Sequence, residues 1–476
     1  MSEIHDLSAV EQAERIRRRE LSPVEVTDHY LARIERFDDL LGAFITVTPE
    51  LAREQAEKAE NRVLSDTPDE LPPLLGVPVP IKDLDMLAGV RWTWGSRVHA
   101  DQVAQVDEDF VAELRRAGAV FTGKTNTPEF GMSCYTENDI APPARTPWDL
   151  SRSAGGSSGG AAAAVAAGLA PMAQGSDGGG SIRIPASACG LYGIKPSRGR
   201  VTQAPVRPDL IGLSATGPLS RTVRDAALML DVIAVNRPGD YHTAQPLPEG
   251  ETFLSHADRD PGRLRIARFA TPPVPGVEPH PDVVDAYEDA TRLLVGLGHE
   301  VEEIPAPFDG SLLRLFEVVW AAMATRYPVP EHEEGRLRPL TRWLRERAGQ
   351  SSIADYLDAT TGLQQGVRAA LPRLERYDAV LNPTLAAPPV EVGHFDSGAD
   401  PAEEFRRMTL FTPFTTVYNV SGQPAVNVPL HWNGDGLPIG VMLAGRMGGE
   451  ATLISLSAQL EAARPWIGRK PPIWTE

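Results

Sequence analysis

The sequence contains little cysteine and no long apolar run. Its 476 residues include two cysteines, Cys134 and Cys189, which is too few for a disulfide scaffold and suits a reduced compartment. Nowhere do about 18 apolar residues follow one another, so no membrane-spanning helix and no membrane partner are expected. The N-terminal residues MSEIHDLSAVEQAERIRRRE lack the apolar segment of a signal peptide. We therefore expect a cytoplasmic protein.

Positive charge is also in short supply. Lysine and arginine number 46 against 64 aspartates and glutamates, which gives a formal net charge of −18. Nucleic acids and anionic membranes are themselves polyanions, so this balance argues against both as partners. A solvated acidic surface is the simplest explanation of this balance. Separately from the charge, we expect a small-molecule substrate and a chain that acts as a monomer or homodimer.

Histidine, the commonest general base in enzymes, is absent from a long central stretch. No histidine occurs between His99 and His242. The ten histidines are scattered and no H-E-x-x-H motif is present, so we expect neither a metal nor another cofactor. A serine nucleophile in this stretch would need a different base.

Helical and strand-like patterns alternate along the chain. Apolar residues at helical spacing follow Ser22-Pro23, a typical helix start, and continue to Phe37. Strand-like segments occupy 74–83, 119–125, 264–270, 300–304, 377–384, 423–430 and 438–445, and further helical patterns occupy 107–117, 222–234, 283–298 and 450–463. This alternation is typical of an α/β fold with a large mixed β-sheet flanked by α-helices on both faces. No repeat or long linker divides the chain, so we expect a single domain over 1–476.

Two glycine-rich turns with embedded serines lie close together in the sequence. GGSSGG occupies residues 155–160, and GSDGGGS occupies residues 175–181. GGSSGG lacks the Lys-Ser/Thr ending of a phosphate-binding P-loop. Its G-x-S-x-G string matches the nucleophile elbow of an α/β-hydrolase, with Ser157 as the nucleophile. However, the polar segment WDLSRSA stands where that elbow needs a strand.

A third interpretation makes both turns parts of one site. Gly178, Gly179 and Gly180 have no side chains to cover their N–H groups, so these groups can form an oxyanion hole beside Ser181. Lys82 ends the apolar segment VPVPIKD and is the best candidate for the missing base, since a lysine held neutral can accept a proton. The residues alone leave these interpretations open.

Several runs of the sequence resemble the amidase signature family. They are GVPVPIKD (76–83), GKTNTPEFG (123–131), GGSSGG (155–160), the long run over 175–201, and NVSGQPAVNVPL and DGLPIGVML near the end. They occur in order over nearly the whole length, which makes the resemblance specific. Within the family, the likeness is to bacterial hydrolases of small synthetic amides, aryl acylamidases and urethane-cleaving amidases.

The resemblance implies a Ser–Ser–Lys triad. Ser181 corresponds to the nucleophile, Ser157 to a bridging serine on a cis peptide, and Lys82 to the general base. The N–H groups from Gly178 through Ser181 correspond to the oxyanion hole. Ser176 departs from the threonine that is frequent at this position of the family, but it keeps the hydroxyl.

Further site residues are expected around the triad. A segment that lines the site in the family predicts substrate contacts from Gly131, Met132, Cys134 and Tyr135. Cys134 equally suits a small buried filler. Arg200 is a candidate contact for a substrate carbonyl or carboxylate, with a surface arginine as the alternative. Asp177 and Arg183 flank Ser181, and we expect them to form a structural ion pair.

The resemblance also implies a division of the chain and a function. We expect an N-terminal helical region over 1–65, a core with the triad over 70–235, and a variable region over 305–420 that sets substrate specificity. The implied activity is hydrolysis of C–N bonds in small aryl or alkyl amides, extending to carbamates and esters. Two alternatives are the A subunit of a tRNA-dependent amidotransferase, which has the same triad, and a non-catalytic binding protein on the same fold.

Overall fold

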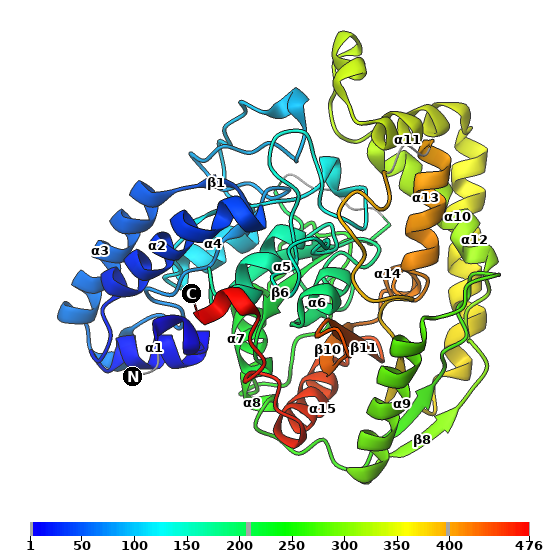
Figure 1. Cartoon of the computed structure of the whole chain (residues 1–476). Coiled ribbons are helices and arrows are strands. Elements are labelled where there is room, and N and C mark those ends of the chain that lie inside the picture. The colour runs from blue at the N-terminus through cyan, green and yellow to red at the C-terminus, as the bar shows by residue number, and fades with distance from the viewer. Residues whose placement is uncertain (1–2, 206–210, 397–399, 476) are drawn as a thin grey trace.

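The described part of the chain, residues 3–205, 211–396 and 400–475 of a computed structural model, is built around a mixed sheet of eight strands (Figure 1). The strand order is β4-β6-β5-β10-β11-β9-β7-β8. Neighbours pair antiparallel except at β7, which is parallel to both β8 and β9. The strands are β4 (Met172–Asp177), β5 (Tyr192–Lys195), β6 (Ala215–Ser220), β7 (Arg265–Arg268), β8 (Glu300–Glu303), β9 (Ala379–Pro383), β10 (Ala425–Trp432) and β11 (Pro438–Gly445).

Three further strands form a separate small sheet beside the large one. The strand predicted over 74–83 is reduced to two residues, because Pro78 and Pro80 have no N–H group with which to extend a ladder. The N–H of Gln174 in β4 donates to the carbonyl of Pro80 at 3.2 Å and joins the two sheets. In order, the small sheet contains β1 (Phe44–Val47), β3 (Gly123–Thr125) and β2 (Ile81–Lys82).

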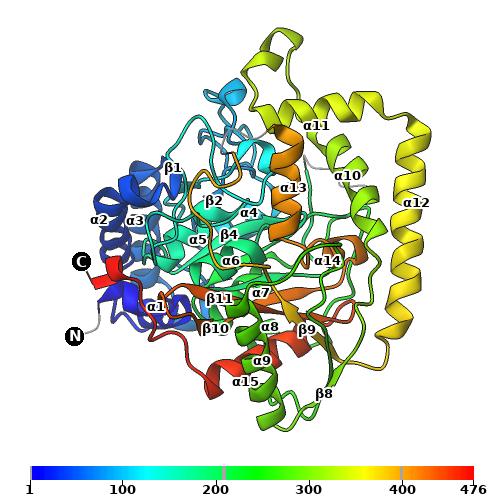
Figure 2. The ribbon, with the colours of Figure 1, turned by 45° about the vertical axis from the view of Figure 1, so that its right-hand side comes forward.

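Helices surround both sheets in the described residues (Figure 2). They are α1 (Ala9–Arg17), α2 (Pro23–Leu41), α3 (Pro49–Ser65), α4 (Asp109–Arg116), α5 (Gly159–Ala166), α6 (Arg183–Cys189), α7 (Val223–Ile233), α8 (Phe253–His256), α9 (Pro281–Gly296), α10 (Ser311–Ala324), α11 (Pro339–Gln350), α12 (Ile353–Ala370), α13 (Pro401–Phe411), α14 (Val417–Ser421) and α15 (Glu450–Ala463). None of these described helices combines the length and the apolar character needed to span a membrane.

Alternating side chains of β11 show that helices cover both faces of the large sheet, as predicted. Ile439, Val441 and Leu443 pack in one apolar core with α7, α9 and α15. Met442 and Ala444 point the opposite way and pack in a second core with α10, α13 and α14. The fold class is therefore α/β, with an apolar core on each side of the sheet.

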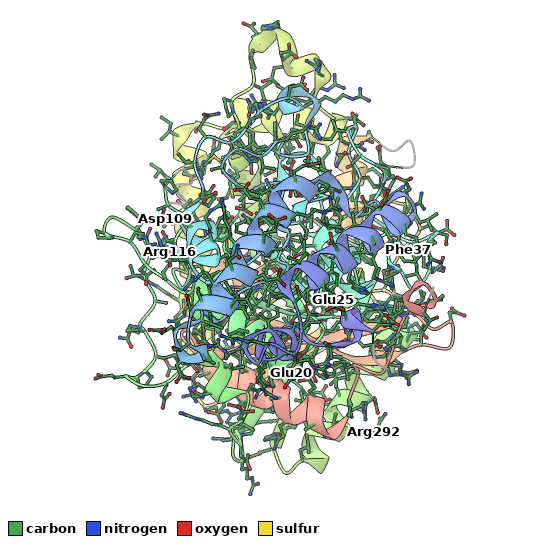
Figure 3. The ribbon with its side chains drawn as sticks, turned by 90° about the vertical axis from the view of Figure 1, so that its left-hand side faces the viewer. Glu20, Glu25, Phe37, Asp109, Arg116 and Arg292 are labelled. Carbon is green, nitrogen blue, oxygen red and sulfur yellow. The ribbon has the colours of Figure 1, made fainter. Side chains whose placement is uncertain are left out.

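The N-terminal helices pack as their apolar spacing predicts. In α2, the apolar residues from Val26 to Phe37 are buried on one face. Ser22 Oγ accepts hydrogen bonds from the N–H groups of Val24 and Glu25 at 3.1 and 3.3 Å, which caps the helix. Figure 3 shows the outer side of α2, with Glu25 and Phe37 toward its two ends. Figure 1 places these helices on the opposite side of the molecule from α10 to α13.

Helices α10 to α13 stand together at one edge of the molecule (Figures 1 and 2). α10 packs against α11 and α12, and α11 packs against α13. Their apolar side chains share the second core with Ile184 of α6, three residues beyond Ser181. The helices of the region 305–420 therefore lie next to the second serine turn.

Candidate active site

Lys82 lies in the interior, among serine hydroxyl groups. It ends β2, and its side chain is fully buried. Its Nζ lies 2.7 Å from Ser157 Oγ, 2.8 Å from Ser158 Oγ and 3.1 Å from Ser176 Oγ. Ser158 and Ser176 were not predicted as site residues, although both lie within the quoted motifs. The lysine thus contacts both glycine-rich serine turns at once.

Two buried lysines in this region have different partners. The backbone N–H of Lys82 donates to Gln174 Oε1 at 2.9 Å, which fixes the position of the chain at the end of β2. Lys124 Nζ lies 3.2 Å from Asp83 Oδ1 and donates to the Asp85 carbonyl at 2.6 Å. A buried ion pair of this kind is costly to break. Lys124 is therefore held in a structural pair, whereas Lys82 faces the serines.

A direct hydrogen bond joins the two serine turns. The N–H of Ser158 donates to the carbonyl of Ser181 at 3.1 Å. The peptide bond between Gly156 and Ser157 is cis. At Gly156, a Cβ atom would lie 2.6 Å from the carbonyl carbon of Tyr135, so no larger residue fits there. The glycines of GGSSGG therefore let the first turn pack closely enough to reach the second.

The peptide between Gly179 and Gly180 is held at both of its polar atoms. The hydroxyls of Thr415 and Thr416 donate to the Gly179 carbonyl at 2.6 and 3.2 Å, and the Gly180 N–H donates to Asp177 Oδ1 at 2.7 Å. The expectation that Gly180 contributes to an oxyanion hole needs correction, because its N–H already donates a hydrogen bond to Asp177. Within the described residues, the nearby N–H groups without an acceptor are those of Gly178, Gly179 and Ser181.

Asp177 also forms the ion pair expected with Arg183. Both side chains are completely buried, and Arg183 Nη2 lies 2.9 Å from Asp177 Oδ1. Asn419 Nδ2 donates to the same oxygen at 2.8 Å. Burial alone would raise the pKa of Asp177, but the Arg183 guanidinium outweighs it and holds that pKa well below its usual range. The charged carboxylate anchors the turn that carries Ser181.

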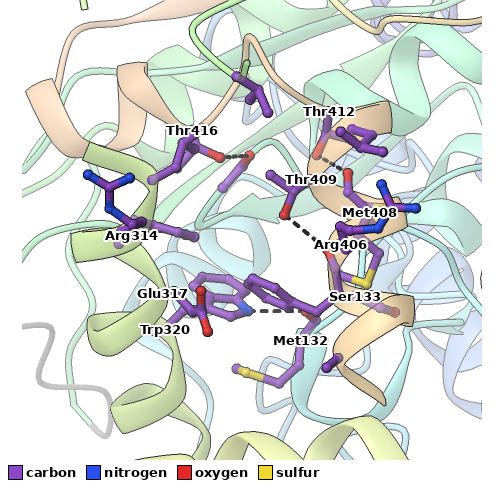
Figure 4. A pocket seen from close by; sticks show the side chains of 18 of the residues that line it. Met132, Ser133, Arg314, Glu317, Trp320, Arg406, Met408, Thr409, Thr412 and Thr416 are labelled. Carbon is purple, nitrogen blue, oxygen red and sulfur yellow. Dashed lines mark hydrogen bonds between the residues drawn. The ribbon is translucent and has the colours of Figure 1, made fainter. Parts of the chain in front are cut away.

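A pocket of about 530 Å³ opens beside Ser181. Three of its lining residues, Met132, Ser133 and Cys134, come from the segment 131–135. Helices α10, α11 and α13 supply much of the remaining wall (Figure 4), including Phe316, Glu317, Trp320, Trp343, Phe405 and Met408. Among the described residues, no cluster of three histidine, cysteine or acidic side chains is arranged to hold a metal ion.

The aromatic wall of the pocket was not predicted residue by residue. Phe316 and Trp320 are four residues apart on α10, and their rings stack with centroids 5.1 Å apart. Trp320 Nε1 donates to the Met132 carbonyl at 3.2 Å, and a Cβ at Gly178 would lie 3.2 Å from the Trp320 ring. Aromatic residues at i and i+4 on a helix share one face, which is the signal that could have identified this pair.

Gly131 and Tyr135 lie near the site but not in the pocket lining. Gly131 is packed behind the first turn, where a Cβ would lie 3.4 Å from Ser157 Oγ. The hydroxyl of Tyr135 donates to Glu404, and its ring is buried. Cys134 does line the pocket, but burial raises the pKa of its thiol, so it stays protonated. The structure therefore supports a packing role for Gly131 and Tyr135 in place of the expected substrate contact.

Arg200 lies away from the pocket, which corrects the prediction of a substrate contact. Its side chain is buried, and its guanidinium forms a bidentate pair with Glu450, with Nε–Oε1 at 3.0 Å and Nη2–Oε2 at 3.1 Å. Its Nη1 donates to the carbonyl of Gln245, and the group lies over the Phe253 ring, 5.5 Å from the centroid. With these partners, the Arg200 guanidinium has a structural role.

Comparisons with known proteins agree on one family. The family model described as Amidase matches residues 25–454. The putative amidase AmiB2 of Mycobacterium tuberculosis is 41% identical over 450 residues, which are 93% of each chain. The A subunit of glutamyl-tRNA(Gln) amidotransferase from Geobacter metallireducens is 35% identical over 501 residues, covering 99% of this chain and 100% of that one. A solved structure of 6-aminohexanoate cyclic dimer hydrolase has a TM-score of 0.92 and 32% identity, covering 99% of this chain and 100% of that chain.

The similarity extends well beyond the short motifs. Each of these relatives covers more than nine-tenths of the chain. The matched residues 25–454 include Lys82, both serine turns and the helices that line the pocket. The chain belongs to the amidase family of hydrolases, which act on amides.

Proposed function

We propose that this chain hydrolyses small amides through an acyl-enzyme formed on Ser181. The observation that carries the proposal is the 2.7 Å contact between Lys82 Nζ and Ser157 Oγ, in a turn that is hydrogen-bonded to Ser181 beside the pocket. Amide hydrolysis needs an activated hydroxyl, stabilisation of an oxyanion and a proton for the leaving amine. The site contains a candidate group for each need.

The proposed proton relay runs through two serines to one lysine. Lys82, in its neutral form, accepts the proton of Ser157 while Ser157 accepts that of Ser181. Ser181 Oγ attacks the amide carbonyl carbon and forms a tetrahedral intermediate. As the C–N bond breaks, the proton returns from Lys82 through Ser157 to the leaving nitrogen. Water then attacks the acyl ester by the same relay, which releases the carboxylic acid and restores Ser181.

The proposed oxyanion donors are the N–H groups of Gly178, Gly179 and Ser181. They lack acceptors within the described residues, and Ser181 carries the attacking oxygen. Asp177 and Thr415 fix the intervening peptide from its two sides. Donors held in place before the reaction stabilise the developing charge without reorganisation, so the anchored turn supports this role.

The pocket supports amides with an apolar aryl or alkyl body as substrates. Its wall contains the stacked rings of Phe316 and Trp320, and its volume of about 530 Å³ suits a small molecule. Carbamates and esters share the acyl-enzyme route, so we include urethane cleavage in the proposed range. Turnover of an aryl amide without turnover of the matching aryl carbamate would exclude carbamates from it.

The two alternative functions make different predictions. An amidotransferase A subunit, like the Geobacter metallireducens relative, needs partner subunits, so hydrolysis of small amides by the purified chain alone favours the hydrolase. A non-catalytic protein would not turn over any amide. A nucleophile elbow at Ser157 needs a strand leading into it. In the described residues no strand lies between β3 and Ser157, whereas β4 ends at Asp177, four residues before Ser181.

Labelling with a fluorophosphonate tests the assignment of the nucleophile. Intact mass and peptide mapping should locate a single adduct on Ser181, and Ser181→Ala should abolish it. Ser157→Ala should slow labelling strongly, because the relay is broken. An adduct on Ser157 would support the elbow instead, and no adduct on the folded protein would favour a partner-dependent role or a non-catalytic one.

The location and assembly of the protein complete the proposal. We keep the cytoplasm as the expected location and a monomer or homodimer as the expected state. The formal net charge of −18 supports the expectation that nucleic acid is not a partner. Light scattering on the purified chain measures the assembly state directly, and a trimer or larger species would contradict it.

A further inference from the structure

Three arginines, each from a different helix, line the pocket. Arg314 belongs to α10, Arg347 to α11 and Arg406 to α13, and the acidic residue among the lining residues is Glu317. Figure 4 shows Arg314 and Arg406 on opposite sides of the pocket. The chain as a whole is strongly acidic, with a formal net charge of −18. The pocket, with more positive than negative lining groups, therefore differs from the chain as a whole.

Two of these arginines already have carboxylate partners. Arg347 Nη2 lies 2.7 Å from Glu317 Oε1. Arg406 forms a bidentate pair with Glu403, with Nε–Oε2 at 2.6 Å and Nη2–Oε1 at 2.8 Å. Each guanidinium therefore has a carboxylate at short range, and Glu403 also pairs with Arg407, whose Nε lies 3.1 Å from Oε1. Because these arginines already have carboxylate partners, they have less tendency to bind an anionic ligand.

Arg314 differs from the other two. It forms no hydrogen bond or ion pair with any residue that the structure describes, although it lines the pocket and is exposed. Its charge acts on Asp309, but that carboxylate accepts the N–H of Ser311 at 2.7 Å and is not paired with Arg314. Among the described residues, Arg314 is therefore the lining arginine without a hydrogen-bonded or ion-paired carboxylate.

Helix α10 connects this charge to the reaction centre. Trp320, on the same helix, donates to the Met132 carbonyl and packs near Gly178, next to the proposed oxyanion donors. Arg314 precedes Trp320 by six residues, which is about 9 Å along a helix axis. Phe316 lies between them and also lines the pocket. Ser181, Trp320 and Arg314 line the same pocket, so a molecule whose amide lies at Ser181 can extend across the pocket toward a guanidinium.

We propose that Arg314 binds a carboxylate of the substrate at a point remote from the amide. A guanidinium presents paired N–H donors that match a carboxylate and stays charged at every working pH. The proposal rests on the proposed hydrolase function and narrows its substrate class to amides with an apolar body and an anionic end. Arg347 and Arg406 keep their own carboxylates when such a substrate binds.

A set of chromogenic amides with one chain length tests the proposal. It comprises the 4-nitroanilides of hexanoic acid, hexanedioic acid and 6-aminohexanoic acid, which end in a methyl, a carboxylate and an ammonium group. The hexanoyl amide of 5-amino-2-nitrobenzoate adds a carboxylate on the leaving ring instead. We expect one of the two carboxylates to raise kcat/KM about tenfold over the neutral anilide, and the ammonium compound to be the poorest. Added salt should reduce these differences.

Substitution of Arg314 identifies the group responsible. Arg314→Gln should remove the advantage of the carboxylate, mainly through KM, so that kcat/KM for the carboxylate compound falls to the level of the neutral anilide. Arg326→Gln is the matched control, because Arg326 is exposed just beyond the end of α10 and is not a lining residue. Equal kcat/KM for all four compounds, or an equal loss for all four in Arg314→Gln, would overturn the proposal and leave the hydrolase function intact.

A binding measurement separates the two proposals if turnover fails. In Ser181→Ala, quenching of tryptophan fluorescence reports binding, because Trp320 and Trp343 line the pocket. If wild type hydrolyses none of the four, tighter binding of a carboxylate compound that Arg314→Gln abolishes would support the anion site and reject the hydrolase function. Equal binding of all four compounds would overturn the anion site.

Discussion

The hydroxyl of Thr415 donates to the carbonyl oxygen of Gly179 at 2.6 Å, directly before the glycine whose N–H is bound by Asp177. Thr415→Val keeps the shape of the side chain but removes this donor. We expect kcat for an aryl amide to fall about tenfold with little change in KM, because the oxyanion donors lose part of their anchoring.

A neighbouring threonine provides the control for this substitution. Thr412 lines the pocket, but its hydroxyl donates to the Met408 carbonyl at 2.9 Å at the C-terminal end of α13. Thr412→Val should therefore leave kcat close to that of wild type. Equal losses of kcat in the two variants would show that the Thr415 hydroxyl has no special role in the turn.

Ser158 should contribute to the activity through Lys82. Its Oγ lies 2.8 Å from Lys82 Nζ and also donates to the Ser176 carbonyl at 3.1 Å. Ser158→Ala should lower kcat by about tenfold or more and move the acidic limb of the pH–rate profile, since the lysine loses a hydroxyl that orients it. The conservative Ser176→Thr keeps its hydroxyl and should retain both properties. An unchanged pH profile in Ser158→Ala would reduce Ser158 to a packing role.

Trp320 should govern substrate affinity. Trp320→Ala removes a ring that adjoins Gly178 and stacks on Phe316, so we expect KM for aryl amides to rise about tenfold or more. Trp320→Phe keeps most of the ring and loses the hydrogen bond to the Met132 carbonyl, so its KM should lie between the two. Fluorophosphonate labelling of Ser181 should proceed at a similar rate in all three proteins. A strong loss of labelling would show that Trp320 supports the turn itself.

The half-buried Glu461, next to the buried Asp225, should make stability depend on pH. Burial raises the pKa of Glu461 to about 7, and the charge of Asp225 adds to this. Among the described residues, Glu461 Oε1 and Asp225 Oδ2 have no hydrogen-bond partner. The ordinary pKa of the glutamate is 4.5, so between pH 4.5 and 7 the folded state binds more protons than the unfolded state. Stability from this group is therefore lost as the pH rises through that window.

Glu461→Gln removes the titration and should raise the melting temperature at alkaline pH. We expect a gain of about 1–3 °C at pH 8 and almost none at pH 5 in scanning calorimetry. Glu346→Gln, at an exposed position of α11, should change neither value. A gain of the same size at both pH values would contradict the assignment to ionisation of Glu461.

The sequence motifs predicted which chemical groups form the site, but they predicted the residues around those groups less well. Lys82, Ser157 and Ser181 each stand in a run of glycines or β-prone residues whose local pattern is recognisable, and the structure brings the three segments together. The strand β4 was not predicted, because Gly175 and the glycines after it have the composition of a turn. Its pairing with β6 stabilises the strand, although the local propensity of these residues does not favour one.

Long-range partners account for what the sequence could not predict. Arg200 and Glu450 are 250 residues apart, so nothing in the local KPSRG turn indicates that the guanidinium is already bound. Likewise, Phe316 and Trp320 belong to a helix without a motif, and their place beside Gly178 follows from tertiary packing. The hydrogen bond from the Gly180 N–H to Asp177 is a similar case, because the spacing of the motif does not indicate where the Asp177 side chain points.

The serine turns and the helices of the pocket wall come from separate parts of the sequence, and this separation bears on the evolution of the enzyme. Lys82, Ser157 and Ser181 come from the first 181 residues of the chain, whereas the helices α10, α11 and α13 that line the pocket begin at Ser311. Inherited changes in α10 to α13 can therefore exchange one substrate for another while the serines and the lysine stay in place. Related enzymes that descend from one ancestor can in this way come to act on different substrates while they keep the same reaction.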